Sequence, residues 1–373
     1  MPTLTIDGEQ ITVPAGTTVI QAAEKLGIFV PRYCYHPGLS IAGNCRICLV
    51  EIEKAPKLQI ACNTPVADGM VVNTKSSKVN QGRESVLEFL LINHPLDCPV
   101  CDQSGECDLQ NFYMQYGLYD PRFKEQKVKK AKATPLGPTV MLDAERCVLC
   151  SRCVRFTDEI SKTGELGIFN RGDKAEVGVY PDKVLDNKYS GNVVDICPVG
   201  ALTDRDFRFK ARVWYLSTAP SVCTGCAQGC NIDLHYVLDR PHLADGARVM
   251  RVKPRYNADV NQWWMCDEGR YGLKLIDQGR LRTVLYKGAE SNWEKAFTEL
   301  AAVLSQVKSE KRQGQVGVIA LAQQTTEELF LIGELFKESL GISNCTAQVP
   351  AQPGSSDNFL MKADNAVCHP NRQ

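Results

Sequence analysis

Residues 145–156 read ERCVLCSRCVRF, in which successive cysteines are separated by two residues. This spacing of Cys147, Cys150 and Cys153 is typical of a bend that wraps three corners of a [4Fe-4S] cluster. Cys197, which is followed directly by Pro198, is suited to supply the remaining corner. Because no second triad lies between positions 153 and 197, we expect these four thiolates to hold one cluster.

A second set of thiols lies nearer the amino terminus, at Cys34, Cys45, Cys48 and Cys62. Its spacing of ten, two and thirteen intervening residues is related to that of plant-type [2Fe-2S] ferredoxins, which have four residues between the first pair. Gly43, beside Asn44, would let backbone amides approach the sulfurs and stabilise a reduced cluster. Four thiolates on two irons are the best fit, and zinc, which accepts the same ligands, is the alternative.

A third set mixes one imidazole with three thiolates, at His94, Cys98, Cys101 and Cys107. A lone histidine at a helix end is usually a solvated or capping residue, but His94 lies four positions before a cysteine triad. We therefore predict that it is a cluster ligand. A neutral imidazole in place of a thiolate removes one negative charge, so we expect a higher reduction potential for this cluster.

The fourth set has a wider spacer and lies at Cys223, Cys226, Cys230 and Cys266. A [4Fe-4S] cluster or zinc would fit these ligands, and the three neighbouring sets favour iron. We expect His235 and His242, which are nearby in sequence, to be ordinary polar residues. Cys345 and Cys368 are the members of the 17 cysteines that lie outside all four sets.

The composition excludes several classes of protein. The amino terminus has no basic region followed by an apolar stretch, so a secreted disulfide scaffold is disfavoured and a reducing compartment is expected. The longest apolar stretch, Phe89 to Ile92, is far too short to span a membrane. Lysine plus arginine equals aspartate plus glutamate at 43 each, which gives no field to attract nucleic acid.

Two basic features have an ordinary and a functional interpretation. The run Arg122 to Lys132 is predicted to be a solvated connector, with a docking strip for an acidic partner as the alternative. Arg146, Arg152 and Arg155 are predicted to lie on a solvated or salt-bridged surface, and tuning of a cluster is the alternative.

The hydrophobic pattern predicts an α+β protein of several small domains. Strands are expected at 4–6 and 10–13 around Asp7-Gly8, and near 46–53 and 70–73, with a helix from Thr18 that Gln21 caps and Gly27 ends. A further helix is expected over 81–93, with its apolar face at 86, 87, 89, 90 and 92. An α/β segment would follow over 139–215, and then a cysteine loop module.

The last ninety residues have a different pattern. Ser291 and Glu294 would cap a helix to Ser305, 316–321 is predicted to be a buried strand, and Thr325 and Glu328 would cap a helix to 340. No strand is predicted from 347 onwards, so this domain looks unfinished. The predicted domains are therefore 1–78, 79–120, 121–216, 217–280 and 281–373.

These motifs resemble those of the large iron-sulfur subunit of respiratory complex I, the bacterial NADH-quinone oxidoreductase. The resemblance covers roughly residues 1–280 and is carried by CYHP at 34–37, GNCRICLVE at 43–51, HPLDCPVC at 94–101, the 145–156 stretch, and VDICPVGAL at 194–202. Residues 281–373 resemble the start of the family's molybdopterin-oxidoreductase-like domain, which continues for several hundred residues in typical members.

The resemblance implies a β-grasp [2Fe-2S] domain, [4Fe-4S] clusters at the His94 and 147–197 sets, and an additional [4Fe-4S] cluster at 223–266. It implies a subunit that conducts electrons without binding NADH and has no catalytic residues. Its partners would be the flavin-bearing, NADH-binding subunit and other subunits of the peripheral arm. The complex would be a hetero-oligomer on the cytoplasmic side of the bacterial inner membrane, and this chain would neither span the membrane nor bind nucleic acid. An electron-transfer subunit of an NAD-linked hydrogenase or formate dehydrogenase is the alternative, and a zinc-bearing scaffold is a third possibility.

Overall fold

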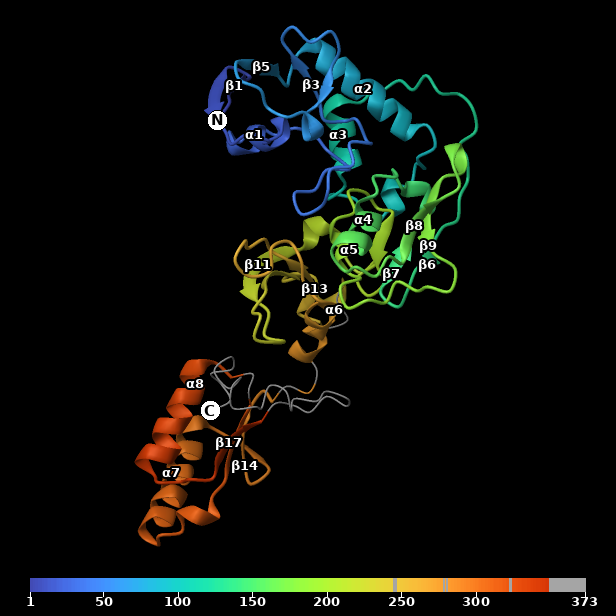
Figure 1. Cartoon of the computed structure of the whole chain (residues 1–373). Helices are drawn as coiled ribbons and strands as arrows, with labels where there is room; N and C mark the ends of the chain where they lie inside the picture. Colours follow the sequence, from blue (N-terminus) through green and yellow to red (C-terminus); the bar gives the residue numbers. More distant parts are fainter. Residues whose placement is uncertain (244–246, 278, 280, 322–323, 349–373) are drawn as a thin grey trace. The chain divides into compact units, whose positions relative to one another are not determined.

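The computed structural model describes residues 1–243, 247–277, 279, 281–321 and 324–348 (Figure 1). The chain forms two compact units. The first contains residues 1–223 and 230–276, and the second contains 224–229 and the residues from 277 onwards. None of the described helices is long and apolar enough to cross a membrane.

The amino-terminal part is a five-stranded mixed sheet with one helix, α1 (Val19–Lys25). Its order is β2-β1-β5-β3-β4, and β1 and β5 are parallel while the other pairs are antiparallel. The strands are β1 (Thr3–Ile6), β2 (Glu9–Thr12), β3 (Leu49–Ile52), β4 (Gln59–Ile60) and β5 (Met70–Asn73). The predicted hairpin turn is confirmed, with Asp7 and Gly8 both at positive φ, and Gln21 Oε1 accepts a hydrogen bond from Thr18 N at the start of α1.

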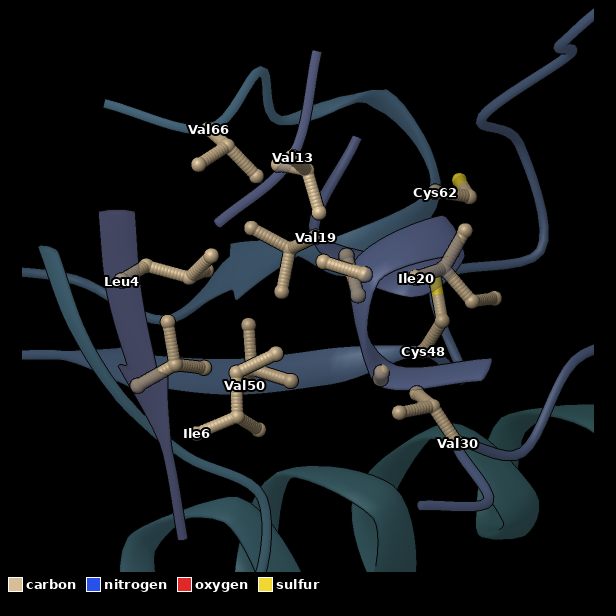
Figure 2. Close-up of a cluster of buried hydrophobic side chains, with 14 of the residues drawn as sticks. Leu4, Ile6, Val13, Val19, Ile20, Val30, Cys48, Val50, Cys62 and Val66 are labelled. Carbon is tan, nitrogen blue, oxygen red and sulfur yellow. The ribbon is translucent and has the colours of Figure 1, made fainter. Parts of the chain in front are cut away.

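Alternation in β1 creates the core of this part. Leu4 and Ile6 point inward and pack with Val19 and Ile20 of α1, and all four side chains are almost fully buried (Figure 2). Burial of each such side chain stabilises the fold by about 1.5–3 kcal/mol. Cys48 and Cys62 belong to the same apolar cluster, so this core also positions thiols.

Two helices follow, α2 (Ser77–Leu91) and α3 (Asp108–Tyr116). Helix α2 begins earlier than predicted because the Ser76 side chain accepts a hydrogen bond from Val79 N and caps it. Its buried residues are Val79, Arg83 and Leu87, whereas Phe89 is 75% exposed, so the predicted apolar face was wrong at that position. Arg83 is tolerated inside because its guanidinium donates to Leu49 O and Tyr116 Oη.

The basic run from 122 to 132 is only partly a solvated connector. Lys127 Nζ donates to the carbonyls of Leu91 and Ile92 at 2.7 and 2.8 Å, which satisfies the carboxyl end of α2. Lys132 Nζ lies 2.8 Å from Glu145 Oε2. The prediction of simple solvation was therefore wrong for these two lysines, because carbonyls and a carboxylate from other segments meet them.

The next part contains a three-stranded sheet of order β10-β7-β6, a β-hairpin and two short helices. Its elements are β6 (Thr134–Pro135), β7 (Val140–Leu142), α4 (Arg152–Glu159), β8 (Leu166–Phe169), β9 (Glu176–Val179), α5 (Asn192–Asp195) and β10 (Leu202–Asp204). Their shared core includes Phe156, Leu166 and Val193, which are all almost completely buried.

The segment predicted as a cysteine loop module is an antiparallel sheet followed by a helix. It contains β11 (Ser217–Val222), β12 (Asn231–Tyr236), β13 (Val249–Pro254) and α6 (Asp267–Tyr271). The prediction missed this sheet because β11 and β12 bury few large apolar side chains; half of the β11 residues are exposed.

In the second unit, two hairpin strands precede a long helix, and two parallel strands flank another helix. The elements are β14 (Val284–Tyr286), β15 (Ala289–Ser291), α7 (Trp293–Ser309), β16 (Val318–Leu321), α8 (Thr326–Ile332), its continuation as a π-helix (Gly333–Ser339), and β17 (Cys345–Gln348).

Three predictions for this unit need correction. Asn292, and not Ser291, caps α7, since its side chain accepts from Lys295 N. Ile319 of β16 is 69% exposed, so this strand is not buried throughout. Strand β17 pairs in parallel with β16 and was missed, because its short polar sequence shows no strand pattern. The Thr325–Glu328 capping box is confirmed, and the remaining predictions for 349–373, including Cys368, lie outside the described residues.

Candidate iron-sulfur sites

The thiols of the first set lie together in the amino-terminal part. The Cys34 side chain hydrogen-bonds those of Cys45 and Cys62, and Cys62 also meets Cys48. These thiol–thiol hydrogen bonds lower the pKa of Cys34 and Cys48 and raise the pKa of Cys45 and Cys62. The structure therefore brings all four predicted ligands into contact.

Backbone amides surround these sulfurs, as the position of Gly43 predicts. Gly43 adopts φ +63°, and the amide of Asn44 donates to the Cys34 sulfur. Cys34 N lies 3.4 Å from Cys45 Sγ, and the amide of Ile47 also donates to Cys45. Such N–H···S contacts stabilise added negative charge on a cluster.

The second set lines one cavity. His94, Cys98, Cys101 and Cys107 share it with Arg146 and Gly200, among others. Burial, together with the nearby charges of Arg146 and Lys127, lowers the pKa of His94 to about 4, so the imidazole is neutral near pH 7 and can ligate a metal. Burial also raises the pKa of Cys107 to about 11.

The third set lines another cavity, whose wall is otherwise mainly apolar. All four predicted ligands, Cys147, Cys150, Cys153 and Cys197, face it. Burial raises the pKa of Cys147 to about 11 and that of Cys197 to about 12. Thiolates concentrated in such a place need compensating positive charge, and a bound metal cluster supplies it. The donor set thus fits a buried iron-sulfur cluster.

The structure brings three of the four members of the last set into one unit. Cys223 and Cys230 close the base of the β11–β12 hairpin, where Cys223 N donates to Cys230 O at 2.8 Å. A Cβ on Gly269 would lie 2.8 Å from Cys223 Sγ and 3.6 Å from Cys266 Sγ, so both sulfurs lie against this glycine. Cys226 lies in the 224–229 segment of the second unit, and it is exposed.

Two further findings concern metal ligands and histidines. Across the described ranges, no three His, Cys, Asp or Glu side chains are arranged to hold a single metal ion. His235 accepts a hydrogen bond from Arg251 Nε at 3.0 Å, which agrees with its predicted role as an ordinary polar residue. His242 is exposed.

The arginines around the third set are not on a solvated surface. Arg146 and Arg152 are only 4% and 8% exposed, which corrects the prediction. Arg146 contacts Asp97 and Asp143, at 3.0 and 3.4 Å. Arg152 donates to Tyr35 O and Ile196 O instead. No local pattern indicates this burial, because the carbonyls that receive Arg152 come from remote segments.

One apolar cluster joins the first three sets. It contains thiols from each of them, namely Cys34 and Cys45, Cys107, and Cys147, Cys150 and Cys197. Tyr33 lies in the same cluster, fully buried, with its ring 5.2 Å from that of Phe112. Three sites that are separate in sequence therefore share one water-excluding core.

A charged contact fixes β13 to the second set. Glu106, next to Cys107, receives both guanidinium Nη atoms of Arg251 at 2.7 and 2.8 Å and Lys253 Nζ at 3.1 Å. Burial opposes ionisation of Glu106, but these hydrogen bonds and charges prevail and lower its pKa to about 2. Sequence reasoning missed this contact, which joins residues about 145 positions apart.

Four family models match successive parts of the chain. A 2Fe-2S iron-sulfur cluster binding domain matches 1–77, and the NADH-ubiquinone oxidoreductase-G iron-sulfur binding region matches 83–122. The ferredoxin-like domain of NADH-quinone oxidoreductase subunit 3 matches 137–203, and the molybdopterin oxidoreductase Fe4S4 domain matches 216–278. The chain is therefore an iron-sulfur protein with one 2Fe-2S domain and several 4Fe-4S domains.

Curated relatives narrow this class. The NADH-quinone oxidoreductase-G protein of Rickettsia bellii is 42% identical over 346 residues, covering 91% of this chain and 49% of the relative. The 78 kDa subunit of mitochondrial NADH-ubiquinone oxidoreductase from Candida albicans is 40% identical over 351 residues, covering 93% and 47%. Over the matched residues the chain is a homologue of the NADH-quinone oxidoreductase-G proteins, which confirms the resemblance. It spans about half the length of these curated relatives.

A solved structure shows a further likeness. The matched chain, in the crystal structure of an NAD+-reducing [NiFe]-hydrogenase in its H2-reduced state, is 30% identical, with a TM-score of 0.51. The match covers 57% of this chain and 91% of that chain.

Proposed function

We propose that this chain is an electron-transfer subunit of the peripheral arm of an NADH-quinone oxidoreductase. The observation that supports it best is the apolar cluster that contains thiols from the first three sets. Electron transfer between centres needs them to be close and shielded from water, and a shared core provides both.

The proposal assigns each set to one centre. Cys34, Cys45, Cys48 and Cys62 would hold a [2Fe-2S] cluster, and the other three sets would each hold a [4Fe-4S] cluster. The fourth assignment, with Cys226, rests on the cysteine spacing and on the match to an Fe4S4 domain. The domain limits at 78, 120, 216 and 280 are part of the same proposal.

Bound clusters would supply one-electron oxidation and reduction, and the chain's residues would hold and tune them. The thiolates and His94 would anchor the irons, the amides of Asn44 and Ile47 would donate to sulfur, and the apolar walls would exclude water. No residue of this chain is required as an acid, a base or a nucleophile.

By this proposal the partners are the flavin-bearing, NADH-binding subunit and other subunits of the peripheral arm. The chain would act within a hetero-oligomer on the cytoplasmic side of the bacterial inner membrane. The likeness to a chain of the NAD+-reducing hydrogenase favours one second candidate, the corresponding electron-transfer role in an NAD-linked hydrogenase. Co-purification of the chain with its partner subunits separates the two.

The test compares two cysteine substitutions in the assembled complex. Cys150→Ser should remove one [4Fe-4S] signal from the electron paramagnetic resonance spectrum and sharply reduce NADH-to-quinone turnover. NADH oxidation by artificial acceptors should be largely intact, because it needs only the flavin-bearing subunit. Cys345→Ser is the matched control, since Cys345 lies outside the four sets and its thiol donates to Ile342 O.

Unchanged quinone turnover in an assembled Cys150→Ser complex would contradict the conducting role. Metal analysis tests the assignments independently. Iron should be near 14 atoms per chain, from about one two-iron and three four-iron clusters, with matching sulfide. Zinc in place of iron and sulfide would instead support a scaffold without redox function.

A further inference from the structure

Arg152 is a buried cation that lines the cavity of the third set. Its side chain is 8% exposed, and it faces the same cavity as Cys147, Cys150, Cys153 and Cys197. Within the described ranges no carboxylate forms an ion pair with it. Burial of an unpaired guanidinium is costly, so its position requires an explanation.

The hydrogen bonds of Arg152 leave part of its capacity unused. Nη1 donates to Ile196 O at 3.0 Å and Nη2 to Tyr35 O at 2.7 Å, both of which are neutral carbonyls. The Nε–H group is buried and has no partner among the described atoms of the protein. The side chain therefore offers a full positive charge and one free donor next to four sulfurs.

The electrostatic neighbours of Arg152 indicate what its charge meets. The groups that favour its charged form are, in order, Cys150, Asp108 and Cys197, while Arg32 opposes it. Two of the three are predicted ligands of the third set, and Asp108 adjoins Cys107 of the second. Arg146 differs, because Asp97 and Asp143 already compensate its charge.

We propose that Arg152 is the positioning residue that raises the reduction potential of the third cluster, through its fixed positive charge and its Nε–H donor. This rests on the proposed function. Reduction adds one electron to the cluster, and no bond forms or breaks. Because the reduced cluster is more negative by one charge, a nearby guanidinium and an N–H···S hydrogen bond stabilise it more than the oxidised cluster.

The test is a redox titration of the full chain with dithionite, followed by electron paramagnetic resonance. Arg152→Gln should shift the midpoint potential of the 147–197 cluster to a clearly more negative value. Arg152→Lys keeps the charge but loses the Nε–H group, so we expect a smaller shift in the same direction. Arg83→Gln is the matched control, since Arg83 is also buried and donates to a carbonyl but does not line this cavity; it should leave this potential unchanged.

The outcomes separate this inference from the proposed function. If the wild-type chain shows no iron-sulfur signals, the proposed function fails. If all clusters form but both Arg152 variants keep the wild-type potential, the proposed role of Arg152 is wrong. Should Arg152→Gln not retain the cluster, Arg152→Lys decides alone, and an unshifted potential in that variant overturns the inference. An equal shift in Arg83→Gln would also overturn it, because any buried arginine would then have the same effect.

Discussion

Gly200 lies three residues after Cys197, but it faces the cavity of the His94 set. A Cβ at this position would lie 2.2 Å from Cys101 Sγ and 3.0 Å from Gln103 Cβ. Atoms at such distances must move apart, and the sulfur that would move is a predicted cluster ligand. The absence of a side chain here therefore keeps Cys101 in place.

We expect Gly200→Ala to reduce or abolish the [4Fe-4S] cluster of the His94 set while the [2Fe-2S] cluster is retained. The physical reason is displacement of Cys101, which has no alternative ligand in the cavity wall apart from the other members of its set. Iron content and the electron paramagnetic resonance spectrum of the reduced chain measure the effect. Gly272→Ala is the control, since a Cβ there meets nothing within 4 Å. A full set of signals in Gly200→Ala would show that Cys101 can shift without losing its iron.

Single residues also show what sequence alone can predict. The thiols of the first three sets were predicted correctly as groups, because thiolate spacing along the chain limits how a cluster can be wrapped. Gly200 and Arg152 were not assigned a role, since each acts on a partner from another segment. Their own sequence neighbourhoods contain no sign of that partner.

Helix α4 shows the same division at the scale of elements. It begins within the third set, and its arginines reach the loop that contains Cys34: Arg152 donates to Tyr35 O, and Arg155 donates to Cys34 O and Ser40 O. At the far end of the helix, Glu159 accepts from Ser40 N at 2.8 Å. A single helix thus holds the first and third sets against each other.

Elements with strong local signals were predicted, and those stabilised by remote contacts were not. Helix α1 has its cap and its stop signal within a few residues, and both predictions were confirmed. Strands β11 and β12 have little local pattern and depend on pairing with each other and with β13. Lys127 likewise caps α2 from a segment about 35 residues away, which no local pattern reveals.

The contact of Glu106 with β13 gives a prediction at this scale. Glu106→Gln should weaken the attachment of β13, because a charged hydrogen-bond acceptor is lost while Arg251 and Lys253 stay partly buried. A loss of about 1.5–3 kcal/mol would raise amide hydrogen exchange in β12 and β13 about 10- to 100-fold. Glu310→Gln, which alters an exposed ion pair with Arg312, should leave exchange in these strands unchanged. Equal exchange in both variants would mean that the sheet holds its place without Glu106.

At the scale of the whole molecule, the two units differ in what stabilises them. The first three sets lie inside the first unit, where their thiols are part of the apolar clusters themselves. The described part of the second unit has an ordinary α/β arrangement, with α7 and the β16–β17 pair, and its described cysteines are limited to Cys345 and the exposed Cys226 of the fourth set. Metal should therefore stabilise one unit far more than the other.

This difference predicts an uneven response to removal of iron from the full chain by a chelator under reducing conditions. Without iron, the cavities of the second and third sets lose their contents and are lined by neutral thiols, because burial raises the pKa of Cys107 and Cys147. Hydrogen exchange should then rise strongly in α3, α4 and β10, which border these cavities, and should change little in α7. The second unit is an internal control in the same sample. A uniform rise across both units would indicate general unfolding, and no rise in α4 would show that the fold of the first unit does not depend on its metal.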